Sequence, residues 1–289
     1  MRTYLLPGMA ILLLTLTMTA CSRINLAYRN LDTLIPWTLN DYLDMDRNQR
    51  QHLQAHLREH LDWHCRTQLP SYLDNLQQLR QQIASEQLDS QALRDHYQQV
   101  RQAMHEIATQ ITPTSIELLR KLDDRQVAEL GEALEKDRRE REKKYLQPEP
   151  PQQIRERAER MQGRIETWFG STSATQRQRI LAWAHALGEQ NRLWLENRAH
   201  WQRSFLEAVR QRHEPGFETR MTRLLQDRES LWSNEYRQAF AHAERVGIEL
   251  FSDLYTLSDH TQRRHLTDRL HQLDKNLGAL ECLPQTAAR

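Results

Sequence analysis

Apolar residues recur at helical spacing along most of the chain. The clearest series begins near residue 173 and places an apolar residue at every seventh position. Its members are Ile180, Leu187, Trp194, Trp201 and Ala208. This spacing predicts one helix of about forty residues that packs lengthwise on its neighbours. Pro215 then ends this helix and opens a second long one, because proline fits the first turn of a helix.

The same pattern predicts four helices in the first half and a shorter one at the end. They cover residues 46–67, 70–85, 90–111, 114–145 and 259–278. Pro70 and Pro113 are expected to separate neighbouring helices, because proline removes a backbone donor. Valine is scarce and few glycines are present outside the first twenty residues, which disfavours a β-rich fold. We therefore predict an all-α, elongated bundle of about seven to eight long antiparallel helices without a sheet.

Four of the expected helices begin with the same local pattern, an Asp or Ser followed three residues later by Gln. The pairs are Asp46 with Gln49, Asp123 with Gln126, Ser173 with Gln176 and Asp259 with Gln262. This is the capping-box arrangement, which marks a helix start. The starts fall in two pairs, 77 residues apart (46 to 123) and 86 apart (173 to 259), which a divergent duplication would produce.

The same segments resemble the Leu-Thr-x-x-Gln repeats of small helical periplasmic chaperones of the Spy and CpxP type. Leu122 to Gln126 is the closest copy, although Asp or Ser replaces Thr throughout. The resemblance implies a chaperone-like protein, whereas capping alone explains the pattern equally simply.

The strongest break in the helical pattern is Pro148-Glu149-Pro150-Pro151. It divides the chain into a leader at 1–20, an N-terminal helical half at 21–146, the proline-rich break at 147–151 and a C-terminal half at 152–289. The two halves are either separate domains or one continuous domain. The chain carries 40 basic and 39 acidic side chains, so no overall field favours nucleic acid as a partner.

The first twenty residues have the character of a signal peptide. The apolar stretch from Leu5 to Thr17 is too short to cross a bilayer. It ends in Met18-Thr19-Ala20-Cys21, which resembles the lipobox of bacterial lipoproteins. The resemblance implies cleavage before Cys21 and its acylation with palmitate-type chains. Ser22, in place of a retention aspartate, implies the periplasmic face of the outer membrane; the alternative is that Cys21 is incidental.

His52, His56, His60 and His64 recur every four residues on the first main helix. Adjacent members of such a ladder lie close enough to chelate Zn²⁺ or Cu²⁺. Each step turns the ladder by a further 40° or so around the helix, so all four cannot share one ion. The candidate ligands are His56, His60 and His64, against the alternative that all are ordinary polar surface residues. His56 to His60 also reads as the H-x-x-E-H string of inverted zinc peptidases, but the helical chain lacks the mixed body of those enzymes.

Cys65 and Cys282 are the thiols that remain once Cys21 is acylated. In an oxidising compartment two such cysteines can close a disulfide. They lie far apart in the chain and outside any short stapled loop, so both the paired and the free state stay open.

The start of the mature chain carries a distinctive string of motifs. It consists of Leu26-Ala27-Tyr28-Arg29-Asn30-Leu31-Asp32, Ile35-Pro36-Trp37, Asp41-Tyr42-Leu43, Gln49-Arg50 and Trp63-His64. This string resembles a domain-of-unknown-function family of Gram-negative helical envelope lipoproteins. The resemblance implies location and fold rather than a mechanism. Its residues form either a ligand surface or a packed, hydrogen-bonded nucleus: Tyr28, Arg29, Trp37, Asp41, Tyr42, Trp63 and His64.

We therefore expect a lipid-anchored periplasmic helical protein that is not an enzyme and uses no cofactor. It would attach to the bilayer through acylated Cys21 and bind an envelope protein partner or an unfolded client, with no nucleic acid. The alternative is a lipoprotein that binds Zn²⁺ or Cu²⁺ through its histidine ladder. A third alternative is a hydrolase. No catalytic motif supports it, but the absence of a motif does not exclude this enzyme class.

Overall fold

The computed structural model describes Tyr28, residues 30–280 and Cys282. These residues form helices and no strand, which confirms the all-α class. The leader, Cys21 and Arg29 lie outside the described residues. In chain order the helices are α3 (Leu31–Leu39), α4 (Arg47–Trp63), η1 (His64–Gln68), α5 (Leu69–Ala84), α6 (Ser90–Arg120), α7 (Asp124–Tyr145), α8 (Pro150–Phe169), α9 (Ala174–Ala186), α10 (Gln190–Arg210), α11 (Phe217–Gln226), η2 (Arg228–Leu231), α12 (Asn234–Thr256) and α13 (His260–Gly278).

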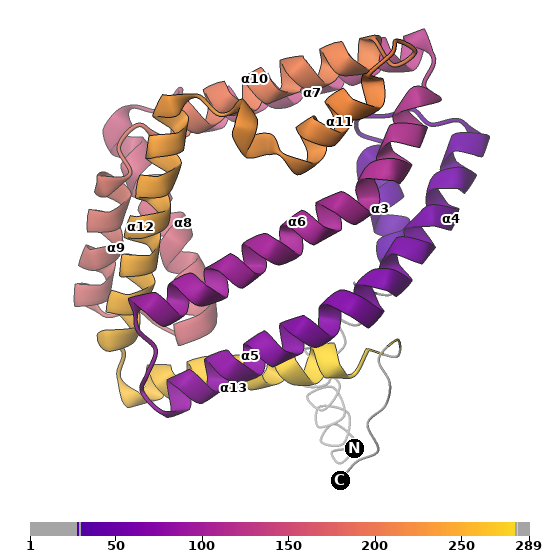
Figure 1. The fold of residues 1–289 in the computed structure, drawn as a ribbon. Helices are drawn as coiled ribbons and strands as arrows, with labels where there is room; N and C mark the ends of the chain where they lie inside the picture. The colour runs from indigo at the N-terminus through magenta and orange to yellow at the C-terminus, as the bar shows by residue number, and fades with distance from the viewer. Residues whose placement is uncertain (1–27, 29, 281, 283–289) are drawn as a thin grey trace, which may run out of the picture.

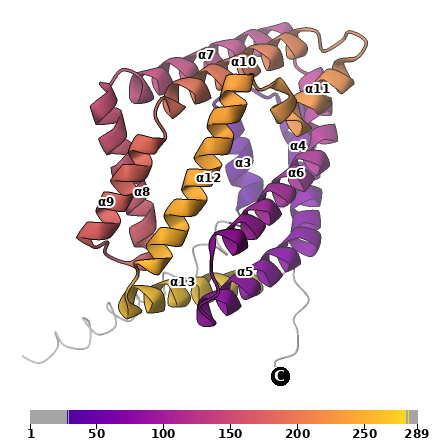
Figure 2. The ribbon, with the colours of Figure 1, turned by 60° about the vertical axis from the view of Figure 1, so that its left-hand side comes forward.

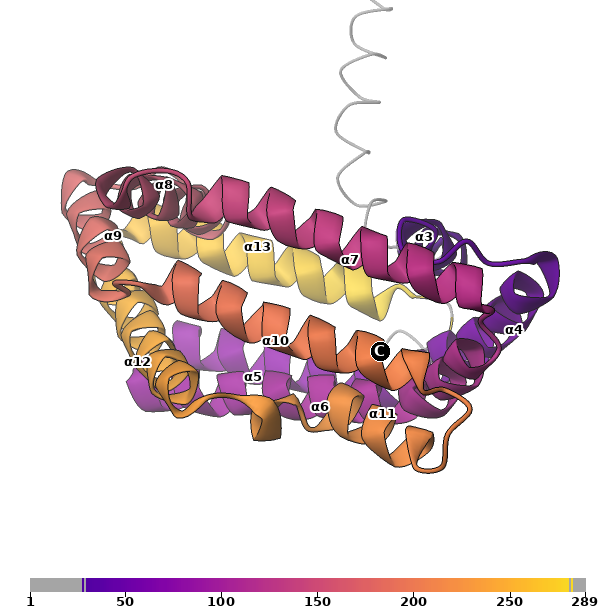
Figure 3. The same cartoon turned by 90° about the horizontal axis from the view of Figure 1, so that it is seen from above.

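The helices pack in an open frame (Figure 1). Seen from above, α7 and α10 run side by side along one edge (Figure 3). A second edge consists of α8, α9 and α12 (Figure 2), and a third of α5 and α13. The fourth edge is α4, with α3 packed on it. The long helix α6 crosses the frame and packs on α12, α11 and α4, which brace it from both ends.

The two longest predicted helices are each interrupted, so the prediction of one continuous helix from residue 173 is wrong. That segment divides into α9 and α10 at Gly188, which has a φ of +49°. The buried guanidinium of Arg157, on α8, donates to the carbonyls of Ala184 (2.8 Å) and Gly188 (3.3 Å). Arg157 therefore supplies hydrogen bonds to two carbonyls at the α9–α10 break, where the chain loses the regular bonds of a continuous helix.

The helix expected after Pro215 is also interrupted. It divides into α11, the short η2 and α12, and the Ser233 Oγ accepts from the Tyr236 N–H to start α12. These two breaks contribute to a helix number above the seven to eight expected.

Two prolines expected to separate helices do not do so. Pro113 lies within α6, where both it and Thr109 are exposed. Pro113 has no N–H to donate to the Thr109 carbonyl, but this carbonyl lies on the exposed side of α6, where water can bond to it. Pro70 lies in the first turn of α5, which follows α4 through the π-turn η1 without a loop. The missing donor of proline costs little in a first turn.

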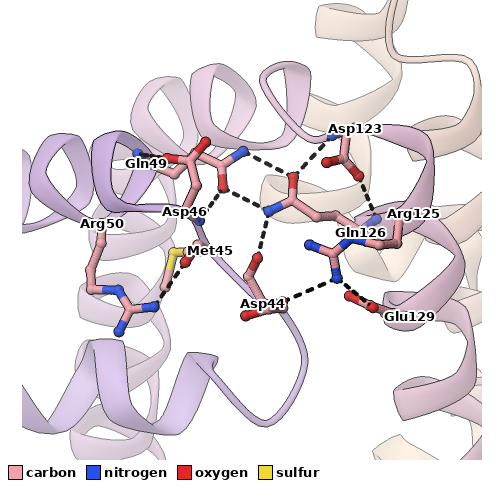
Figure 4. Close-up of polar contacts among 9 residues, drawn as sticks. All are labelled: Asp44, Met45, Asp46, Gln49, Arg50, Asp123, Arg125, Gln126 and Glu129. Carbon is pink, nitrogen blue, oxygen red and sulfur yellow. Dashed lines mark hydrogen bonds and ion pairs between the residues drawn. The ribbon is translucent and has the colours of Figure 1, made fainter.

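The four predicted capping boxes are confirmed, and they join in space two by two. In the first pair the side chains of Gln49 and Gln126 exchange hydrogen bonds of 3.0 and 2.8 Å across the α4–α7 corner (Figure 4). Each amide oxygen also accepts from the backbone N–H of its own cap residue, Asp46 or Asp123. The remaining amide hydrogens reach the carbonyls of Lys121 (2.9 Å) and Asp44 (2.6 Å). We call this arrangement a glutamine clasp.

A second glutamine clasp closes the corner between α9 and α13. Gln176 and Gln262 exchange hydrogen bonds of 3.0 and 2.9 Å, and both side chains are buried. Gln262 also donates to the carbonyl of Ser171, two residues before the cap Ser173, just as Gln126 donates to Asp44, two before Asp46. The pairs seen in the sequence, 77 and 86 residues apart, are thus the pairs that meet in space.

Two main hydrophobic cores lie near the two clasps, and both take residues from each side of the proline-rich break. The core at the first clasp joins Leu53 and Leu130 to Val209 and Met221. The core at the second joins Leu76 and Ile83 to helices that follow the break. Residues from both sides of the proline-rich break therefore pack together in each core.

Candidate functional site

A groove of about 850 Å³ lies between α5 and α6, with α13 contributing to its floor. Its apolar residues include Leu76 from α5 and Leu273 and Leu277 from α13. On the α6 side, Val100 is 58% exposed and Met104 is 63% exposed. Exposed apolar side chains that adjoin one another beside a groove are typical of a binding surface.

The rest of the groove lining is polar but almost uncharged. It includes Gln68, Ser71, Asn75, Gln98, Gln99 and Gln102, with Glu106 as the acidic member. Two polar bridges reach α6 from the preceding segments: Gln68 in η1 donates to Glu106 (2.8 Å), and Asn75 on α5 donates to Gln99. Amide side chains can both donate and accept, so the rim can pair with the backbone of an inserted peptide whatever its side chains are.

This groove is not evident from the sequence. Val100, Met104 and Ile111 share one face of α6, and all three are exposed. Their spacing is the same as that of core residues, so the sequence alone does not show that no other helix covers them. An apolar face that stays open is a property of the packing.

The histidine ladder does not act as one unit in the structure. The His60 Nε2 is 2.8 Å from the Thr114 Oγ1. The His64 Nδ1 is 3.0 Å from the Tyr28 hydroxyl and its Nε2 is 3.2 Å from the Tyr72 hydroxyl. Burial lowers the pKa of both imidazoles. His60 and His64 are thus held in hydrogen bonds, whereas His52 and His56 lie close to Glu117 on α6.

The two ends of the described chain meet at the π-turn η1. Tyr28 packs beside His64, and its hydroxyl also donates to the Leu61 carbonyl (3.3 Å). Burial raises the pKa of this hydroxyl to about 12, which keeps it neutral. Cys282 forms a disulfide with Cys65 in η1, with the Cα atoms 6.0 Å apart. Leu69, Tyr72, Leu277 and Leu280 complete this cluster, which we call the anchor nucleus.

The candidate ligand surface is divided rather than assembled. Tyr28 and His64 are in direct contact within the anchor nucleus. Trp37 instead projects from α3 and is 68% exposed, and Asp41 is also exposed. Tyr42 packs against the core near the first clasp, Trp63 is half-buried on α4, and Arg29 lies outside the described residues. None of the described residues of this set lines the groove between α5 and α6.

Within the described residues, no helix combines the length and the apolar character needed to cross a bilayer. The described residues form an all-helical frame with two clasped corners and a groove between α5 and α6. A family profile matches residues 41–237, so the chain belongs to the family of unknown function DUF6279. Neither a curated protein nor a solved structure matches the chain.

Proposed function

We propose that this protein is a lipid-anchored, non-enzymatic envelope protein that holds an unfolded segment of a client protein in the groove between α5 and α6. The observation that carries the proposal is the exposed pair Val100 and Met104 above an apolar floor. Methionine adapts its shape to different partners, so it suits a surface that accepts many sequences.

The neutral amide rim supports the same proposal. A charged groove would select clients by charge, whereas glutamine and asparagine side chains pair with any extended backbone. The Asn75–Gln99 bridge between α5 and α6 is exposed to water, so a client backbone can replace it at a small cost in free energy.

The position of the anchor nucleus supports attachment to a membrane surface. Gln68, Tyr72 and Leu277 line the groove, and Tyr72 and Leu277 also belong to the anchor nucleus. Tyr28 follows Cys21 by seven residues, which reach at most about 25 Å when extended. With Cys21 acylated and the leader removed, one end of the groove would lie close to the outer membrane on its periplasmic side.

Suppression of aggregation tests the client-binding role. The soluble chain from Ser22 onward is mixed with a guanidinium-denatured protein such as citrate synthase, and light scattering is followed after dilution. We expect suppression by the unsubstituted chain and a loss of at least several-fold in the Val100→Asp, Met104→Asp double variant. Leu181→Asp is the matched control, because Leu181 is an exposed apolar residue on α9, outside the groove. Absence of suppression, or equal suppression by the groove variant, would refute this role.

Anchoring is tested separately in cells. Metabolic labelling with a palmitate analogue should mark the full chain, and Cys21→Ala should abolish both the label and leader cleavage. After cell fractionation, the Cys21→Ala variant should no longer be found in the outer-membrane fraction. An unlabelled but processed wild-type chain would refute lipidation and leave the client-binding test unaffected.

A further inference from the structure

Three potential metal ligands from two helices lie together beside the first glutamine clasp. His52 and His56 are one turn apart on α4, with ring centroids 4.5 Å from each other. Glu117 on α6 places its Oε2 3.1 Å from the His52 Nε2. One ligand atom from each residue lies within 4.8 Å of the others. The side chains of His52, His56 and Glu117 are 23%, 33% and 52% exposed, so an ion can reach them from solvent.

The distances are close to those that a metal ion needs. In a tetrahedral site with bonds of about 2.0–2.1 Å, ligand atoms are about 3.4 Å apart. The ligand atoms, within 4.8 Å of one another, are thus separated by at most about 1.4 Å more than this spacing. Two imidazoles and one carboxylate suit Zn²⁺, Cu²⁺ or Ni²⁺ better than Mg²⁺ or Ca²⁺, which prefer oxygen ligands.

The backbone around these ligands is held on both sides. The Gln49 amide donates to the Lys121 carbonyl one turn before His52, and His60 contacts Thr114 one turn after His56. Both contacts join α4 to α6, so the helices that carry the ligands are fixed relative to each other. A preorganised site of this kind binds an ion with little loss of conformational entropy.

Two neighbouring charges set the local chemistry. The Glu59 Oε2 lies 3.1 Å from the His56 Nδ1. When the His56 Nδ1 donates to Glu59, the Nε2 of His56 remains to bind a metal. A carboxylate that accepts from the other ring nitrogen makes the imidazole a stronger metal ligand. The Lys121 ammonium lies 3.5 Å from the His52 Nε2. This cation competes with a bound metal ion and lowers its affinity.

We propose that His52, His56 and Glu117 bind one divalent transition-metal ion of the zinc and copper class and thereby bridge α4 to α6. The site is independent of the α5–α6 groove. It differs from the ligand set expected from the sequence, because His60 and His64 are engaged elsewhere and Glu117 takes their place.

Calorimetric titration of the soluble chain with Zn²⁺, and separately with Cu²⁺, tests the site. We expect one equivalent to bind and the melting temperature to rise on binding. His56→Ala and Glu117→Gln should each weaken binding at least tenfold, whereas Lys121→Met should strengthen it. His105→Ala is the matched control, an exposed histidine on α6 away from the cluster.

Folding of each variant is checked by circular dichroism and by its melting temperature without metal. Affinity that is unchanged in both His56→Ala and Glu117→Gln would overturn the proposal. So would binding that is lost in His105→Ala to the same degree, or the absence of any saturable binding to the folded chain.

Discussion

The glutamine clasp at the α4–α7 corner offers the most direct test of how the frame is stabilised. Gln126→Ala removes four hydrogen bonds: two accepted by the Gln126 Oε1, from Asp123 and Gln49, and two donated by its Nε2, to Asp44 and Gln49. At about 1 kcal/mol net per bond, the four bonds give an expected loss of about 4 kcal/mol. This corresponds to a decrease in melting temperature of roughly 8–16 °C.

The reciprocal bonds make a second, sharper prediction in a double-mutant cycle. Once Gln49→Ala has removed the partner amide, Gln126→Ala loses two fewer bonds. The combined variant should therefore be less destabilised than the sum of the single variants, by about 1–3 kcal/mol. Urea unfolding followed by circular dichroism measures the unfolding free energies of the unsubstituted chain, the two single variants and the double variant under identical conditions.

Gln51→Ala is the matched control, because Gln51 is exposed on the same helix and outside the clasp. It should change the unfolding free energy by less than about 0.5 kcal/mol. Strictly additive effects of Gln49→Ala and Gln126→Ala, or a Gln126→Ala variant as stable as Gln51→Ala, would refute the assignment of the clasp as a stabilising unit.

Three other predictions concern the anchor nucleus and the α9–α10 break. Reduction of the Cys65–Cys282 disulfide, which spans 217 residues, should lower the unfolding free energy by about 2–5 kcal/mol; equal urea midpoints and equal non-reducing gel mobility with and without reductant would contradict it. Because burial lowers the pKa of His64 below the unfolded value of about 6.5, its contribution to stability is present above that pH and is lost as the pH falls through the folded pKa. His64→Gln should flatten the fall in urea midpoint between pH 7 and 5, and an unchanged pH profile would count against this origin. Arg157→Ala leaves the Ala184 and Gly188 carbonyls without their donor and should cost about 2–3 kcal/mol, whereas exposed Arg164→Ala should have little effect; equal melting temperatures would refute the role of Arg157.

The helix starts were the most predictable part of the fold, because a capping box is a local device. Asp46 and Gln49 lie three residues apart and satisfy each other's backbone donors without help from the rest of the chain. The helix ends were less predictable. Proline normally ends a helix. Helix α6 continues through Pro113 because the carbonyl left without a donor is exposed, and the helical backbone continues past Pro70 because η1 leads directly into α5.

The candidate ligands show the same division between local and distant contacts. The histidine ladder was visible in the sequence, because four-residue spacing alone places His52 beside His56. The separation of these two from His60 and His64 depends on Glu117, Thr114 and Tyr28, which come from other segments. No spacing within α4 contains that information.

The sequence by itself determined the all-helical class, the four capped helix starts and their division into two pairs, since each depends on residues within one or two helical turns. Only the tertiary structure decided that the paired glutamines bond to each other, that α9 and α10 separate at Gly188, and that Val100 and Met104 remain uncovered. These features depend on which helix lies beside which, and a heptad or capping pattern specifies a helix and its buried face without specifying the neighbour.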